Sequence, residues 1–282
     1  MNYFILVKKE KNYTFALSNK KNTLTDVSFL KSINKQKNLG ETQLKTMKQY
    51  EQVIAVMEEN GGWATLGFLY HKVDSSEWKT KTPFATIRRI VQDERFFFKI
   101  KVGLWGLKSD QKLLLEKFGL NISKEKEQDF SHSYFQGLLI EIGNLKGYHT
   151  YIPSQDKNKL FLDRKLGSVS SLDQILDFTY PEVIKRAKTV DVIWFNERKF
   201  PHAFFEVEHT TDIQNSLLKF NDLQDFYSKF YILSASERKR EFEQKITYTS
   251  FKNIRDRVSF IDYDFVVNLH TKSFELAKIG QL

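Results

Sequence analysis

The stretch from Asp191 to Thr211, DVIWFNERKFPHAFFEVEHTT, constrains the fold of this chain more than any other. Two short apolar runs, Val192–Phe195 and Phe204–Val207, flank a polar segment, and the second run is interrupted by one acidic residue. This pattern predicts two strands joined by a turn. We expect the rest of the chain to be organised around this hairpin.

Three carboxylates accompany the hairpin. Asp191 opens the first strand, and Glu206 and Glu208 are two residues apart in the second. Alternate residues of a strand share a face, so both glutamates are expected to point the same way. Burying acidic groups among aromatic residues costs several kcal/mol per uncompensated charge, so a cation is expected among them. The stretch therefore predicts a Mg²⁺ site. The alternative is a solvated hairpin edge with paired charges.

Composition narrows the class of protein. With 282 residues and 41% apolar content, the chain is long enough for two domains with packed cores. A formal charge of +9 indicates a polyanionic partner, and nucleic acid is favoured over a membrane because no basic amphipathic helix stands out. No apolar run approaches the roughly 18 residues that cross a bilayer. The opening MNYFILVKKEKN places its lysines after the apolar run, unlike a signal peptide, so a cytoplasmic location is expected.

Several chemistries are excluded by absent residues. The chain has no cysteine, which excludes disulfides, thiolate zinc sites and a cysteine nucleophile. Its six histidines show no HExxH spacing, and neither a phosphate-binding G-x-x-x-x-G-K-[ST] loop nor a G-x-S-x-G elbow occurs. ATP-driven and serine-triad mechanisms are therefore not expected.

Residues 41–110 show the pattern of a small helical module, whereas residues 1–40 stay unassigned. One helix is predicted to end near Asn60, a second to span Thr65–Val73, and a third to begin at Thr82 with Pro83 in its first turn. Residues 95–107 then predict two short strands that turn near Gly103.

Three helices followed by a hairpin resemble the winged helix-turn-helix domain, in particular its HARE-HTH type, through the TPFATIRRIV helix and the closing GLWGL. The resemblance implies that the third helix enters the major groove and that the wing meets phosphates. The residues it implies for DNA contact are Lys79, Lys81, Thr82, Thr86, Arg88, Arg89, Lys99 and Lys101. The alternative is the solvated face of a small helical bundle.

Residues 111–128 are predicted to be a linker, and residues 129–282 an α/β unit. The apolar periodicity predicts a helix over 130–145, a strand over 148–152, a mostly helical segment over 172–187, the hairpin, and then further helices and strands to residue 279. This αβββαβ order resembles the core of the PD-(D/E)XK nuclease superfamily. The expected fold class is α/β (α+β), with a winged helix-turn-helix domain followed by this nuclease core.

The hairpin carries the same resemblance. Asp191 matches the first acidic position of the superfamily motif, Glu206 the second, and Glu208 the position usually held by lysine. A glutamate in that position is similar to some type II restriction endonucleases, and Val190 stands where a proline often precedes the first acidic residue.

The resemblance implies Mg²⁺ held by oxygen ligands and a metal-activated water that attacks phosphorus. The implied metal ligands are Asp191, Glu206, Glu208, the Val207 carbonyl and Glu141 on the first core helix. Glu208 binds the metal or deprotonates the water, and Lys219 on the following helix is a candidate for a displaced catalytic lysine. His209 is interpreted as a packing or phosphate-contact residue rather than a general base.

The resulting prediction is a type II restriction endonuclease that cuts double-stranded DNA at or near a short site, partly read by the winged helix. With one site per chain, cutting both strands requires two copies or two successive events, and a homodimer, at least a transient one on DNA, is expected. Two alternatives stay open: an endonuclease that requires a methylated base, and a non-catalytic winged-helix DNA-binding regulator whose carboxylates are structural.

Overall fold

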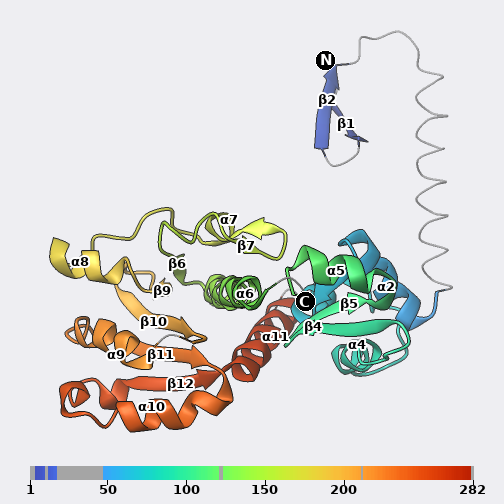
Figure 1. Ribbon diagram of the computed structural model, residues 1–282. Helices are drawn as coiled ribbons and strands as arrows, with labels where there is room; N and C mark the ends of the chain where they lie inside the picture. Colours follow the sequence, from blue (N-terminus) through green and yellow to red (C-terminus); the bar gives the residue numbers. More distant parts are fainter. Residues whose placement is uncertain (1–3, 10–11, 18–46, 121–122, 211, 281–282) are drawn as a thin grey trace. The chain divides into compact units, whose positions relative to one another are not determined.

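A computed structural model describes residues 4–9, 12–17, 47–120, 123–210 and 212–280. Strands β1 (Phe4–Lys9) and β2 (Asn12–Leu17) pair antiparallel (Figure 1). They fall within the segment that the sequence left unassigned, and the rest of that segment lies outside the described residues. No helix in the described ranges is long and apolar enough to cross a membrane.

The next elements form a small helical module with a three-stranded sheet. They are α2 (Gln49–Glu59), β3 (Trp63–Thr65), α3 (Leu66–Lys72), α4 (Pro83–Ile90), β4 (Phe97–Lys101) and β5 (Leu104–Leu107). The sheet order is β3-β5-β4, with antiparallel pairs throughout. The Thr65 hydroxyl accepts a hydrogen bond from the Phe68 amide at 3.2 Å and so caps α3. The three helices and the hairpin were expected from the sequence, whereas β3 was not.

The remaining elements build a mixed α/β unit. In chain order they are η1 (Lys108–Asp110), α5 (Gln111–Lys117), α6 (Lys124–Leu145), β6 (His149–Tyr151), β7 (Leu160–Phe161), β8 (Arg164–Lys165), α7 (Leu166–Val169), α8 (Pro181–Ala187), β9 (Val192–Phe195), β10 (Pro201–Glu208), α9 (Ile213–Asn221), β11 (Lys229–Ser234), η2 (Ser236–Arg238), α10 (Lys239–Lys245), η3 (Thr249–Phe251), η4 (Arg255–Arg257), β12 (Val258–Asp262) and α11 (Tyr263–Ile279).

Two element boundaries differ from expectation. Helix α6 begins at Lys124, inside the segment expected to be a linker, because the Ser123 hydroxyl accepts from the Lys126 amide at 3.3 Å and caps it. The prediction that residues 172–187 are mostly helical was wrong, since only Pro181–Ala187 is helical. Proline lacks the amide hydrogen that a helix interior needs but is well suited to the first helical turn, so Pro181 starts the helix.

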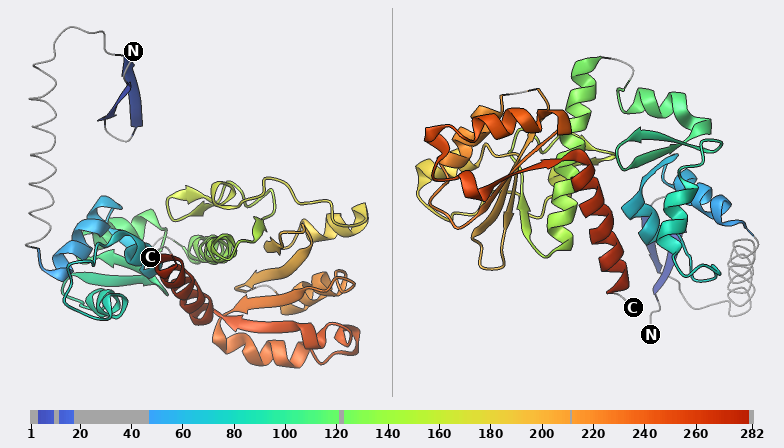
Figure 2. Two further views of the ribbon diagram at one scale, coloured as in Figure 1. Left: turned by 180° about the vertical axis from the view of Figure 1, so that it is seen from behind. Right: turned by 90° about the horizontal axis from the view of Figure 1, so that it is seen from below.

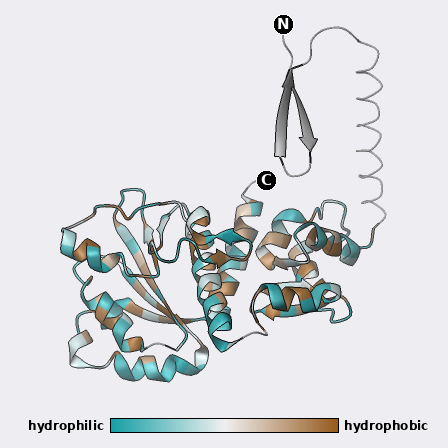
Figure 3. Cartoon of the chain, turned by 45° about the horizontal axis from the view of Figure 1, so that its top comes forward, coloured by the Kyte–Doolittle hydropathy of each residue, from teal (hydrophilic) through white to brown (hydrophobic). Residues whose placement is uncertain are grey.

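A five-stranded sheet with the order β12-β11-β10-β9-β6 is the centre of this unit (Figure 1). β10 lies in the middle, antiparallel to β9 and parallel to β11. Helix α6 packs with one face of the sheet, and α8, α9 and α10 pack with the other (Figure 2). The strands carry mostly apolar residues, whereas the helices alternate apolar and polar ones (Figure 3). Because β10 is covered on both faces, any acidic residue in it is buried.

The β4–β5 hairpin of the small module packs against helices of the α/β unit. The Tyr134 hydroxyl on α6 donates to the Val102 carbonyl at 3.0 Å. Gly103, at the turn, has a φ of 77°, and a side chain there would meet Val267 of α11. Lys101 is 3.8 Å from the Glu127 carboxylate of α6. The turn of this hairpin is therefore part of the packed core.

We expect Gly103→Ala to lower the free energy of unfolding by about 2–4 kcal/mol. A Cβ atom at this position would lie 2.5 Å and 3.0 Å from the two Val267 methyl carbons, in addition to the strain of the positive φ. Gly147→Ala is a matched control, because Gly147 has the same φ of 77° and nothing within 4 Å of the added carbon. Urea unfolding of both variants should show the larger loss for Gly103→Ala. Equal losses would contradict tight packing of the hairpin turn on α11.

Candidate active site at one edge of the five-stranded sheet

The predicted carboxylates meet where β10 ends and β9 begins. In this antiparallel pair Phe205 is opposite Val192, and extending the register by one residue places Glu206 opposite Asp191. The Val207 amide donates to Asp191 Oδ2 at 2.7 Å. The structure therefore brings Asp191 and Glu206 together, as the sequence predicted.

Glu206 is a buried carboxylate with a lysine partner. Its side chain is 2% exposed, and Lys219 Nζ of α9 lies 3.0 Å and 2.8 Å from its two oxygens. Lys219 also donates to the Thr189 carbonyl at 3.1 Å. Burial, followed by the Asp191 charge, raises the pKa of Glu206 well above its usual range. Burial lowers the pKa of Lys219, but the Glu206 and Asp191 carboxylates outweigh it, so this pKa is raised and the ammonium keeps its proton.

Glu208 points to the same helix but has a different partner. The Ser216 hydroxyl of α9 donates to its Oε1, while its buried Oε2 has no hydrogen-bond partner among the described residues. Burial and the Asp191 charge raise the pKa of Glu208. A buried acceptor without a donor is rare in folded proteins, and such an oxygen is available to a bound water or ion.

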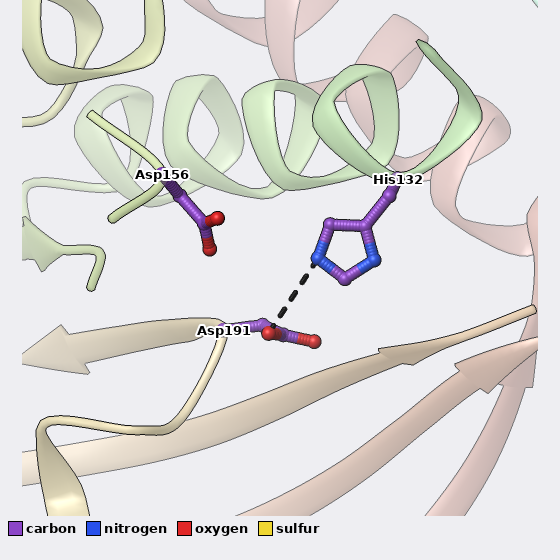
Figure 4. Close-up of side chains that lie close together, drawn as sticks. All are labelled: His132, Asp156 and Asp191. Atoms are coloured by element: carbon purple, nitrogen blue, oxygen red, sulfur yellow. Dashed lines mark ion pairs between the residues drawn. The ribbon is translucent and has the colours of Figure 1, made fainter. Parts of the chain in front are cut away.

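Asp191 joins the carboxylates to a second group of side chains (Figure 4). His132 of α6 and Asp156 of the loop after β6 face it, and one ligand atom from each of the three residues lies within 4.8 Å of the other two. Within the described part of the chain, the ligand atoms of this trio are close enough to share one metal ion, whereas those of Asp191, Glu206 and Glu208 are not all within 4.8 Å of one another. The sequence prediction of three converging carboxylates is therefore only partly matched by the geometry.

Asp191 and His132 adjust each other's ionisation. Burial raises the pKa of Asp191, but the hydrogen bond and charge of His132 lower it more, so its net pKa is below the usual value. Burial lowers the pKa of His132, and the Asp191 carboxylate, with its Oδ1 3.5 Å from His132 Nε2, raises it to a net value above normal. Asp191 is therefore ionised across the physiological pH range.

Sequence reasoning missed His132, Asp156 and Gln136. Gln136 Nε2 donates to Asp156 Oδ2 at 2.9 Å and to the Asp191 carbonyl at 3.2 Å. His132 and Gln136 are four residues apart in the largely buried part of α6, so they share one face of the helix. Polar residues at this spacing on a buried face were the available signal. No local pattern singled out Asp156.

Glu141 is not brought to the other carboxylates. It lies nine residues after His132, which places it on the opposite side of α6. Its carboxylate pairs with His270 Nε2 of α11 at 2.8 Å and with Arg164 at 2.5 Å. The structure therefore does not bring Glu141 to the expected metal site, because Arg164 and His270 from other elements hold it on the far side of the helix.

His209 lies beside the site, in contact with aromatic rings. Its Nδ1 is hydrogen-bonded to the Tyr263 hydroxyl, and its ring is 5.9 Å from that of His132. Burial, with the positive charges of His132 and Lys101, lowers the pKa of His209 to about 4. A neutral, packed imidazole agrees with the interpretation of His209 as a packing or phosphate-contact residue rather than a general base.

The residues expected to contact DNA fall into two groups. Lys79, Lys81, Thr82, Arg88, Arg89 and Lys99 are exposed. Thr86 is buried and donates its hydroxyl to the Thr82 carbonyl at 3.1 Å, so its side chain faces inward. Lys101 is half-buried beside Glu127. The structure thus leaves six of these side chains at the surface and turns two toward the protein.

Several ionisable side chains with shifted pKa values gather at the end of β10, in the middle of an α/β sheet. Such a group of side chains is typical of an enzyme's active site. The family model described as the C-terminal domain of type II restriction enzyme NmeDI matches residues 117–280, more than half of the chain. The chain therefore belongs to this family.

The type II restriction enzyme NmeDI of Neisseria meningitidis serogroup C is a distant relative. It is 23% identical over 150 residues, which cover 50% of this chain and 42% of the relative. The match thus spans less than half the length of that enzyme. No solved structure matches the chain.

Proposed function

We propose that this chain is a type II restriction endonuclease that hydrolyses phosphodiester bonds of double-stranded DNA with Mg²⁺. The observation that carries the proposal is the contact of Lys219 with Glu206, beside Asp191, in a chain that belongs to a restriction-enzyme family. Buried carboxylates and a lysine at one sheet edge are suited to cation binding and to stabilising charge on a phosphate.

We assign the α/β unit to the PD-(D/E)XK superfamily. The order α6, β6, β9, β10, α9 and β11 supports this assignment, because it reproduces the αβββαβ core with antiparallel strands followed by a parallel one. Glu208 occupies the strand position usually held by lysine. We infer that Lys219 of α9 supplies the ammonium group instead, since its nitrogen reaches the second motif carboxylate.

The side chains present fit a hard divalent cation. Asp191 and Glu206 offer carboxylate oxygens, and the Val207 carbonyl is a third proposed ligand. Glu208 Oε2, a buried oxygen without a donor in the described residues, is left for a water held by the cation. We propose that the first three groups hold Mg²⁺. When bound, Mg²⁺ lowers the pKa of a water ligand and neutralises negative charge on the phosphate oxygens.

The protein groups then have separate tasks. Glu208, whose pKa is raised, is the proposed base: its Oε2 accepts a proton of the attacking water as the water oxygen bonds to phosphorus. A phosphorus–oxygen ester bond breaks in the same step, and the leaving oxygen takes up a proton from solvent water. Lys219 remains protonated, because its pKa is raised, and stabilises negative charge on the phosphate oxygens. His209 is uncharged at neutral pH and serves as packing.

We propose that the N-terminal module is a winged helix that binds DNA through α4. Its exposed Arg88 and Arg89 lie in the last turn of that helix. Because the β4–β5 hairpin is packed on α6 and α11, we assign DNA contact to α4 and its flanks rather than to Lys101. Cutting both strands requires two copies of the site or two successive events, and we further propose a homodimer that forms at least transiently on DNA.

The Arg88→Ala/Arg89→Ala double variant is expected to weaken DNA binding about 10- to 100-fold at 0.1 M salt and to reduce the slope of log affinity against log salt by about one or two. The reason is the loss of two cations that neutralise phosphates. Fluorescence anisotropy with a labelled duplex over a salt series measures both quantities. Lys112→Ala on α5 removes an exposed charge from another element and serves as control. Equal affinities of wild type and double variant would contradict DNA binding by α4.

The proposed function is tested by incubating the full chain with large mixed-sequence DNA and Mg²⁺ and sequencing the ends. Discrete fragments with a common sequence support a restriction endonuclease, provided that Asp191→Asn gives none. Matched methylated and unmethylated DNA decide whether a modified base is required. Intact DNA with wild-type protein that binds DNA normally would instead support a non-catalytic regulator.

A further inference from the structure

The trio of His132, Asp156 and Asp191 has the make-up of a cation site with one nitrogen and two oxygen donors. The three side chains come from α6, the loop after β6 and the residue before β9, and they face a common space (Figure 4). Only Asp191 belongs to the carboxylate motif of the hairpin. The other two donors have no task in the hydrolysis proposed above.

The distance between His132 Nε2 and Asp191 Oδ1 is 3.5 Å. A direct nitrogen–oxygen hydrogen bond is shorter, about 2.7–3.2 Å. Two adjacent ligands of one cation, each about 2.0–2.2 Å from it, are about 3.0–3.5 Å apart. The pair is thus a long ion-pair contact, and its spacing lies within the range expected for two ligands of a shared cation.

Asp156 is a carboxylate with almost no access to solvent. Its side chain is 3% exposed, and Lys159 Nζ is 2.7 Å from its Oδ1. The Lys159 side chain is 41% exposed and can turn into solvent, which frees Oδ1 for another cation. Two carboxylates this close need a positive charge between them when both are ionised.

Gln136 supplies an independent indication. Its amide nitrogen fixes Asp156 Oδ2 and the Asp191 carbonyl, the kind of outer hydrogen bonding that orients metal ligands. The side chain is fully buried, and its Oε1 has no partner within the described residues. A buried acceptor without a partner among the described residues is suited to receive a hydrogen bond from a bound water.

We propose that His132, Asp156 and Asp191 form a position for a divalent transition-metal cation, with Asp191 shared with the neighbouring Asp191–Glu206 position. An imidazole donor favours cations from Mn²⁺ to Zn²⁺ over Mg²⁺, which prefers oxygen ligands alone. The cation position needs only the three ligands and does not depend on the nuclease chemistry.

The test uses the full chain without DNA, stripped of metal and loaded with Mn²⁺. Pulsed electron paramagnetic resonance detects ¹⁴N of a coordinated imidazole, and the signal of free Mn²⁺ gives the binding curve. We expect ¹⁴N modulation in the wild type, its loss in His132→Gln, and affinity at this position at least 10-fold lower in Asp156→Asn. His149→Gln, which alters an exposed histidine of β6, is the matched control and should keep the modulation.

Glu206→Gln separates this proposal from the proposed function. We expect it to keep the ¹⁴N modulation, because Glu206 is not among the three ligands. Absence of modulation in the wild type at saturating Mn²⁺, or its persistence in His132→Gln, would overturn the cation position. If His132→Gln does not fold, unchanged Mn²⁺ affinity in Asp156→Asn would overturn it equally. Failure of the nuclease proposal has a different readout, which is uncut DNA with Mg²⁺.

Discussion

Replacing Lys219 by methionine is expected to lower the rate of DNA cleavage by about 10²- to 10⁴-fold, the range in which a single positioned acid–base or charged group contributes. The Lys219 ammonium is 2.8 Å from the nearer oxygen of Glu206 and about a quarter exposed, so it is accessible to solvent while it contacts the buried carboxylate. Methionine keeps the length of the side chain and removes the charge. Single-turnover cleavage at saturating Mg²⁺ measures the chemical step.

The variant also leaves Glu206 without its cation. Breaking a buried ion pair costs about 3–5 kcal/mol when the remaining charge stays ionised. Glu206 can instead take up a proton, because its pKa is already raised, so we expect a loss toward the lower end of that range. Lys219→Arg keeps the charge but not the geometry and should retain intermediate activity. Lys239→Met on α10, at a mostly exposed site, is the matched control. Full activity in Lys219→Met would restrict Lys219 to a structural role.

Glu206→Gln is expected to abolish cleavage and, without metal, to make the protein more stable. Glutamine has nearly the shape of glutamate but no charge, so the cost of a buried carboxylate beside Asp191 is removed. Lys219 keeps the Thr189 carbonyl at 3.1 Å and the nearby Asp191 charge. We expect a gain on the order of 1–2 kcal/mol at pH 8, or about 2–8 °C in Tm for a chain of this size.

The pH dependence of this stability difference follows from the direction in which the pKa of Glu206 is shifted. The pKa of Glu206 is raised in the folded state, so folding is favoured by its protonation. This contribution is fully present below the unfolded pKa, near 4.5, and is lost as the pH rises through the folded pKa. The stability difference between Glu206→Gln and wild type should therefore be small below pH 4.5 and grow with increasing pH. Thermal unfolding in a chelator from pH 4 to 9 measures it.

Added Mg²⁺ should make the wild type more stable than Glu206→Gln, which reverses their order without metal. A ligand that binds only the folded state stabilises it according to its concentration relative to Kd, and Glu206→Gln lacks a proposed ligand. Wild-type Tm should rise with Mg²⁺, whereas that of the variant should not. Glu243→Gln, at an exposed glutamate of α10, should behave like wild type throughout. A variant less stable than wild type at every pH would show that the charge of Glu206 holds the fold together rather than straining it.

The sequence by itself determined the central hairpin and the shared face of two of its acidic residues. Strand alternation and a short turn are local properties, so the two strands around Asp191 and Glu206, and the shared face of Glu206 and Glu208, followed from the order of apolar and polar residues. The register that sets Glu206 opposite Asp191 includes a shift between Pro201 and Ala203, which only the structure shows. Helix starts also followed from local chemistry at Thr65 and Pro83. At Pro181 the same chemistry was misread as an interruption within a longer helix.

Only the tertiary structure decided which partners each ionisable group meets. His132 and Asp156 are 59 and 35 positions before Asp191 in the chain, and no local pattern relates them to it. The direction of Glu141 was set by His270, 129 residues later, and the choice of Glu206 for Lys219 was set by the packing of α9 on β10. Such pairs form because burial removes water from charged groups, so each group needs a protein partner that compensates its charge. Which partner is near depends on how elements that are distant in the sequence pack together.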